Sequence, residues 1–69
     1  MGNHIYKKVE IVGTSEKSSD DAIRNALTKA SSSIQKLRWF ELIETRGSIN
    51  EGSIERWQVT VKVGFTMND

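Results

Sequence analysis

The sequence predicts a small α+β domain in which a strand is followed by a helix and then by two more strands. Two stretches, 39–47 and 54–65, have the apolar and polar alternation of strands. The stretch 22–34 instead repeats its apolar residues every three or four positions, which is typical of a helix with one buried face. Proline is absent, so no proline breaks a long strand or the helix.

The first strand is predicted over His4–Val12, where β-branched and aromatic residues partly alternate with charged residues. This strand ends at Gly13, and the small and polar residues of Gly13–Ser19 are typical of a loop. We therefore expect the chain to leave the sheet at Gly13 and to enter the helix after this loop.

A helix is predicted to begin near Ser19. In the run Ser18–Asp21 a serine can accept a hydrogen bond from a free amide group of the first turn, and two aspartates suit its positive end. The buried face is predicted to consist of Ala22, Ile23, Ala26, Leu27, Ala30 and Ile34. The helix is predicted to end within Gln35–Arg38, where basic residues suit its negative end.

The second and third strands are predicted over Trp39–Gly47 and Ile54–Phe65, joined as a hairpin by a turn that centres on Asn50 and Glu51. Apolar and mostly polar residues alternate along the third strand, which predicts that its apolar side faces the helix. It consists of Trp57, Val59, Val61, Val63 and Phe65.

The position of the turn also predicts the register of the hairpin. Residues lie opposite each other when their numbers sum to about 101. On the helix-facing side, Phe40 is then predicted to pair with Val61, and Leu42 with Val59.

The other side of the hairpin, which we call the outer face, is predicted to carry a large aromatic ring. Successive side chains of a strand point to opposite sides, so Trp39 is directed away from the helix. The outer face is predicted to combine Trp39, Glu41, Ile43, Thr45, Arg56, Gln58, Thr60 and Lys62. A small monomer is expected to expose polar groups there, so another subunit or a flat ligand should cover the ring.

The composition predicts that a single domain, residues 1–69, gains stability from other copies of the chain or from a ligand. A core in so short a chain supplies about 3–5 kcal/mol of net stability. There is no cysteine and only one histidine, His4, which excludes disulfides, thiolate metal sites and zinc clusters. We therefore expect an oligomer without a metal site.

The charge pattern does not select a nucleic acid or a membrane as the partner. Ten basic and nine acidic residues are interspersed, which leaves neither a basic arm nor an acidic tail. No apolar stretch approaches the roughly 18 residues that a membrane-spanning helix requires, and the N-terminus lacks the features of a signal peptide. The absence of cysteine agrees with a cytoplasmic protein, which is the expected location.

Trp39 and Gln58 together suit a planar heterocyclic ligand. An indole can stack on a flat ring, and a side-chain amide offers one donor and one acceptor to the edge of a flavin or a nucleobase. The residues agree equally well with a second interpretation, in which Trp39 fills a subunit interface and Gln58 is solvated. A nucleic-acid-binding sheet is less favoured, because the net charge is nearly neutral and a single exposed aromatic residue is predicted.

Five stretches, in this order and at these spacings, are together specific to one family. They are His4–Ser15, Asp21–Ala26, Trp39–Glu41, Arg46–Gly47 and Gln58–Phe65. In these stretches, and so over nearly its whole length, the chain resembles the dodecins, which are small flavin-binding proteins.

The resemblance implies a fold, an assembly and a ligand. Dodecins have the β-α-β-β order, with a three-stranded antiparallel sheet partly wrapped round the helix, and twelve copies form a hollow shell. Flavin pairs lie on two-fold axes between tryptophans that correspond to Trp39, and a glutamine that bonds the flavin edge corresponds to Gln58. The chain looks more like bacterial members, which favour FMN, than archaeal ones, which take riboflavin or lumichrome. Some bacterial members also bind coenzyme A.

The phosphate contact is the incomplete part of the resemblance. Many bacterial members have an arginine after the Gly-Phe of the last strand, where this chain has Thr66. Arg46 lies in a matching Arg-Gly pair and is the candidate for a basic contact to the ligand. Trp57, on the helix-facing side of its strand, is expected to be structural.

No catalytic group is predicted. The sequence has no Gly-rich phosphate loop, no Ser-His-Asp or Cys-His arrangement and no pair of carboxylates suited to acid–base catalysis. The resemblance implies a protein that sequesters, stores or buffers flavin, because stacking on indole quenches flavin fluorescence and photochemistry. The alternative is a structural or interaction module that uses Trp39 only for oligomer contacts.

Overall fold

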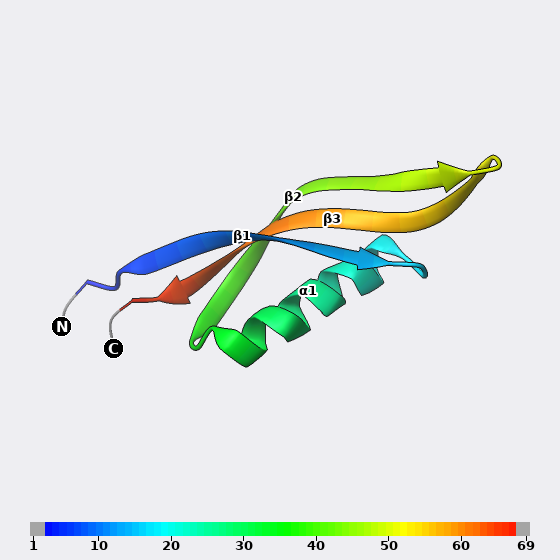
Figure 1. The fold of residues 1–69 in the computed structure, drawn as a ribbon. Coiled ribbons are helices and arrows are strands. Elements are labelled where there is room, and N and C mark those ends of the chain that lie inside the picture. The colour runs from blue at the N-terminus through cyan, green and yellow to red at the C-terminus, as the bar shows by residue number, and fades with distance from the viewer. Residues whose placement is uncertain (1–2, 68–69) are drawn as a thin grey trace.

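A computed structural model describes residues 3–67 as one sheet with a helix on one side. The elements are β1 (Tyr6–Ser15), α1 (Ser19–Ser33), β2 (Leu37–Asn50) and β3 (Ser53–Thr66). All strand pairs are antiparallel in the order β1-β3-β2, so β3 lies in the middle of the sheet (Figure 1). The predicted order of elements and the three-stranded antiparallel sheet are confirmed. Within residues 3–67, no helix is long and apolar enough to cross a membrane.

β1 continues beyond its predicted end, so the prediction of a loop over Gly13–Ser19 is wrong for its first three residues. Residues 13–15 pair with residues 57–59 of β3, which satisfies backbone groups that a loop would leave to water. The hydroxyl of Ser15 accepts a hydrogen bond from the Lys17 N–H at 2.8 Å and donates one to Asp21 at 2.7 Å. The strand therefore leads almost directly into the helix.

Small residues let α1 approach β1 closely. A Cβ atom at Gly13 would collide with the carbonyl oxygen of Ala22 and would lie 2.8 Å from the Cβ of Ala26. Both alanines are buried. No larger residue than glycine therefore fits at position 13, where Ala22 and Ala26 of the helix pack against the strand.

The start of α1 is as predicted. Ser18 is the N-cap residue, and its Oγ accepts a hydrogen bond from the Asp21 N–H at 3.0 Å. Asp20 and Asp21 lie in the first turn, where negative charge stabilises the positive end of the helix. Neighbouring residues thus determine where the helix begins.

The end of α1 comes earlier than predicted. The helix stops at Ser33 and the backbone of Ile34 is extended, so the prediction of an end within Gln35–Arg38 is wrong. No basic residue lies in the last turn. The hydroxyls of Ser31 and Ser32 donate to carbonyl oxygens three residues earlier, at 2.9 and 2.7 Å. Such local bonds compete with continuation of the helix.

The hairpin turn lies one residue later than predicted. It is formed by residues 51–52, whose φ angles of 52° and 81° are typical of a tight two-residue turn with glycine in second place. Phe40 consequently lies opposite Val63 and Leu42 opposite Val61, so both predicted pairs are wrong. The register differs by two residues here, and a shift of two keeps side chains on their predicted faces.

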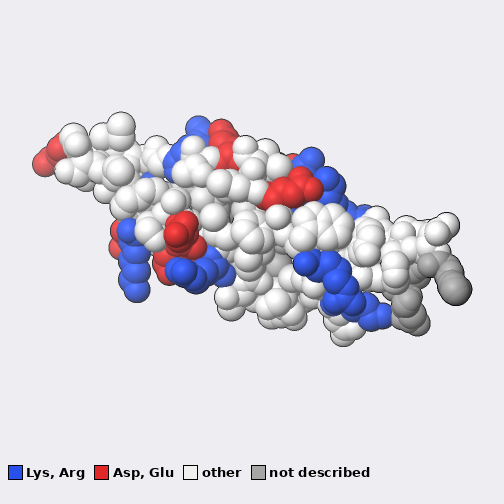
Figure 2. All heavy atoms as spheres, turned by 180° about the vertical axis from the view of Figure 1, so that it is seen from behind, with Lys and Arg blue, Asp and Glu red and all other residues white. Residues whose placement is uncertain are grey.

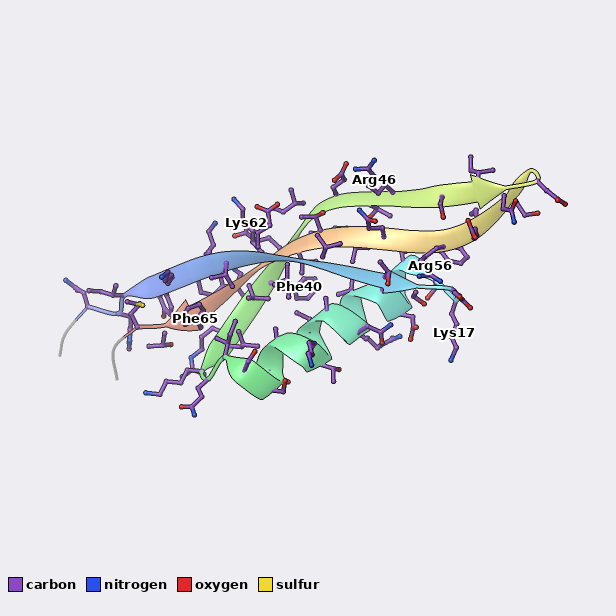
Figure 3. All side chains as sticks on the ribbon, in the orientation of Figure 1. Lys17, Phe40, Arg46, Arg56, Lys62 and Phe65 are labelled. Carbon is purple, nitrogen blue, oxygen red and sulfur yellow. The ribbon has the colours of Figure 1, made fainter. Side chains whose placement is uncertain are left out.

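A β-bulge in β2 changes which side chains share the outer face. The register shifts around Ile43, so that Arg46 lies opposite Gln58 and Thr45 opposite Val59. Thr45 is therefore on the helix side of the sheet, and its predicted place on the outer face is wrong. Arg46 projects from the side of the sheet away from α1 (Figure 3).

The core lies between α1 and the sheet. It is formed by Ala22, Ala26, Ala30, Val59, Val61 and Val63. α1 packs against β1 and β3, so the helix side of β2 is only partly covered. Phe40 points toward α1 and is still 45% exposed, and Leu42 is 50% exposed (Figure 3). This apolar strip is suited to burial against another chain.

Candidate functional site

The outer face is the side of the sheet that α1 does not cover. The register places on it Tyr6, Lys8, Glu10, Val12 and Thr14 of β1, Trp39, Glu41, Glu44 and Arg46 of β2, and Arg56, Gln58, Thr60, Lys62 and Gly64 of β3. Figure 2 shows that basic and acidic side chains are interspersed over the face it displays. A polyanion such as a nucleic acid finds no continuous basic surface on that face.

The ring of Trp39 lies over Gly64, the residue opposite it on β3. A Cβ atom at Gly64 would collide with three atoms of the indole, so the missing side chain makes room for the ring. The ring of Tyr6 meets the indole edge to face, with centroids 5.1 Å apart and an interplanar angle of 78°. Trp39 remains 39% exposed. One side of the indole therefore rests on the backbone, and the other side is open for stacking.

Glu41 contacts Lys8 and Trp39 through one carboxylate oxygen. Its Oε2 lies 3.0 Å from the Nζ of Lys8 and accepts a hydrogen bond from the Nε1 of Trp39 at 3.3 Å. The bonds from Lys8 and from Trp39, with the charge of Lys62, lower the pKa of Glu41 below its ordinary 4.5. Above pH 4.5 the carboxylate of Glu41 is ionised and these contacts contribute to the stability of the fold. The contribution is lost as the pH falls through the lowered pKa and the carboxylate becomes protonated.

Gln58 and Arg46 lie opposite each other on the part of the outer face near the hairpin turn. A cavity of about 310 Å³ is lined by Arg46, Gly47, Ser48, Arg56 and Gln58. The Nη1 of Arg46 is 3.9 Å from Glu44, and the arginine side chain is 63% exposed, so its guanidinium is accessible to an anionic group. Arg56 forms a closer ion pair with Glu16, at 2.9 Å. Arg56 is not among the predicted site residues. Its spacing of two residues from Gln58 could have indicated it, because residues two apart on a strand project from the same face.

Trp39 and Gln58 do not meet within one chain. Trp39 lies opposite Gly64, which is six positions from Gln58 along β3, or about 20 Å at the rise of a strand. The ring system of one flavin is too short to stack on Trp39 and reach Gln58 of the same chain. A site that uses both residues therefore needs two copies of the chain.

Two other residues considered in the sequence, Trp57 and His4, lie in different places. Trp57 is on the helix-facing side of β3, opposite Gly47, and is partly buried. The ring of His4 stacks near that of Tyr6, with centroids 6.2 Å apart. Among the described residues, no group of three or more His, Cys, Asp or Glu side chains is arranged to hold a metal ion.

Replacing Gly64 by alanine is predicted to displace the Trp39 ring. Overpacking costs about 1–3 kcal/mol in a closed core, but a ring that is 39% exposed can move aside, so we expect little loss of stability. The near-UV circular dichroism of the indole should change, measured with Trp57→Phe as background so that Trp39 is the single tryptophan. A spectrum identical to that of the background protein would show that the ring does not depend on Gly64.

Comparisons with known proteins agree with the fold and with the resemblance in sequence. The dodecin family model matches residues 5–68. The dodecin of Thermus thermophilus is 45% identical over 65 residues, which cover 94% of each chain. These matches leave almost no part of the chain outside the alignment.

Solved structures show the same relationship in three dimensions. The dodecin of Streptomyces davaonensis superposes with a TM-score of 0.92 at 48% identity, covering 99% of this chain and 100% of that chain. The dodecin of Streptomyces coelicolor has a TM-score of 0.92 at 46% identity, covering 100% of this chain and 99% of that chain. Family model, sequence and fold thus agree over the whole domain, and the chain belongs to the dodecin family.

Proposed function

We propose that this protein binds a flavin, FMN or riboflavin, on the outer face at Trp39. The observation that carries the proposal is the open side of the indole, whose other side rests on Gly64. A flat aromatic ligand can cover this surface and remove it from water. Membership of the dodecin family supports flavin as that ligand.

The proposed site forms between copies of the chain. The separation of Trp39 and Gln58 within one chain supports a two-fold interface, since a two-fold axis supplies both residues from both copies. The half-exposed side chains of Phe40 and Leu42 support further contacts between subunits. A closed shell of twelve copies is the proposed assembly.

The proposed role is storage and protection of flavin in the cytoplasm, without catalysis. An indole is an electron donor to an excited flavin, so a stacked flavin loses its fluorescence and much of its photochemistry. Binding at two-fold interfaces also places the flavin inside an assembly, where a substrate has little access. The protein would then keep a reactive cofactor in reserve.

Titration of the ligand-free protein with FMN and riboflavin tests this function. We expect flavin fluorescence to fall until the sites are saturated at micromolar concentration. The bound flavin should co-elute with an oligomer whose mass is measured by light scattering. Flavin fluorescence that is unchanged by micromolar protein would contradict the proposal.

FMN is expected to bind more tightly than riboflavin because of Arg46. Its accessible guanidinium can form a charge-assisted hydrogen bond to a phosphate, which riboflavin lacks. Thr66 supplies no charge at the end of β3. The variant Arg46→Ala should therefore lower the affinity for FMN and leave that for riboflavin nearly unchanged. Equal losses for the two ligands would show that Arg46 does not contact the phosphate.

A further inference from the structure

Glu41 lies where it can fix the orientation of the Trp39 ring. The two residues are two positions apart on the outer face of β2, so their side chains project from the same side. The Oε2 of Glu41 accepts the hydrogen bond of the indole Nε1 at 3.3 Å. The Nζ of Lys8, on β1, holds the same oxygen at 3.0 Å. The carboxylate that accepts this bond is therefore held in place by an ion pair with β1, the strand at the other edge of the sheet.

Three contacts restrict the indole together. Gly64 lies beneath the ring, Tyr6 meets it edge to face, and Glu41 binds its only hydrogen-bond donor. A rotation of the Trp39 side chain moves the ring off Gly64 or breaks the bond to Glu41. The contacts come from all three strands, so the sheet as a whole defines the plane of the ring.

We propose that Glu41 is a positioning residue of the ligand site, whose carboxylate holds the Trp39 indole over Gly64 and so presents the open side of the ring for stacking. Its effect on ligand binding rests on the proposed function, whereas the orientation of the ring is a property of the ligand-free protein. A ring that is already ordered loses less conformational freedom when a ligand stacks on it.

The charge of Glu41 matters as well as its shape. An ionised carboxylate is a stronger acceptor for an N–H group than a neutral amide, and Lys8 and Lys62 favour the ionised form. Glutamine at this position would keep the length of the side chain and lose the ion pair with Lys8. Glu44, the next acidic residue on the outer face of β2, instead faces Arg46 at 3.9 Å.

The variants Glu41→Leu and Glu41→Gln test the proposal. The control Glu55→Gln removes the same charge near the hairpin turn, where Glu55 contacts Ser48. Labelling with fluorotryptophan gives separate fluorine resonances for Trp39 and Trp57 in the ligand-free proteins. In Glu41→Leu we expect the Trp39 resonance to move toward that of a mobile, solvated indole, with a smaller change in Glu41→Gln and none in the control. FMN affinity is expected to fall about two- to tenfold in Glu41→Leu.

An unchanged Trp39 resonance in both Glu41 variants would overturn the proposal. A mobile ring with unchanged FMN affinity would overturn the link between the order of the ring and binding. If the wild-type protein binds no FMN while the Trp39 resonance still shifts in Glu41→Leu, the proposed function fails and the positioning of the ring stands. If Glu41→Leu does not assemble, the Trp39 resonance and the FMN affinity of Glu41→Gln are compared with those of Glu55→Gln. A change in Glu41→Gln alone supports the proposal, and no difference between the two variants overturns it.

Discussion

Replacing Trp39 by alanine is expected to weaken FMN binding by about 2–4 kcal/mol, or roughly 30- to 1,000-fold, in a protein that still assembles. The substitution removes the ring that we propose to stack on the flavin and leaves only a methyl group beside Gly64. Titration calorimetry with FMN measures the loss of affinity. Light scattering of the same samples measures the mass of the assembly.

Trp57→Phe is the matched control for this experiment. Trp57 lies on the helix-facing side of β3, and phenylalanine keeps an aromatic ring there, so FMN affinity should not change. The alternative function predicts another result, because a Trp39 that served only subunit contacts would leave Trp39→Ala dissociated. An intact assembly with undiminished FMN binding would exclude the indole from the ligand site.

Alanine at position 13 is expected to lower the free energy of unfolding by about 1–3 kcal/mol. The new Cβ would collide with the carbonyl oxygen of Ala22 and lie 2.8 Å from the Cβ of Ala26. These atoms are backbone and Cβ atoms of α1, so no side-chain rotation relieves the overlap, and the helix must move away from β1. Urea unfolding followed by far-UV circular dichroism measures the loss.

Gly52→Asn is the control for Gly13→Ala. A Cβ at Gly52 meets no atom within 4 Å, and its φ of 81° is one that asparagine tolerates. We expect a change within about 0.5 kcal/mol, as for most surface substitutions. If Gly13→Ala were as stable as the wild-type protein, the close approach of α1 to β1 would not be needed for stability.

Local signals predict the elements of this fold and the faces they present. The cap at Ser18 and the alternation along β3 depend on neighbouring residues, and the structure confirms both. Trp39 falls on the predicted outer face because its place relative to Phe40 depends on one step of alternation. A register error of two residues does not disturb such a prediction.

Features that depend on distant residues are missed. Residues 13–15 have the composition of a loop and form a strand because β3 offers them partners. The bulge around Ile43 has no local signal, yet it decides that Arg46 shares a face with Gln58. Residues 50–52 contain more than one turn-forming residue, and only the folded hairpin shows which of them form the turn.

For the candidate site, the sequence predicts residues and not their arrangement. Trp39, Gln58 and Arg46 all lie on the outer face, and their roles in binding stay predictions. The contacts that orient the indole come from three different strands, at Tyr6, Glu41 and Gly64. The spacing of Trp39 and Glu41 indicates that they share a face. No spacing along the chain indicates that Tyr6 and Gly64 join them there.

The separation of Trp39 on β2 from Gln58 on β3 has a thermodynamic consequence for the proposed site. A flavin that touches two copies links its own binding to the association of subunits, and each equilibrium strengthens the other. Dilution that separates the subunits then releases the flavin, and excess flavin holds the subunits together. We therefore expect the proposed site to retain its ligand only while the subunits stay associated, so that retention depends on the concentration of chains.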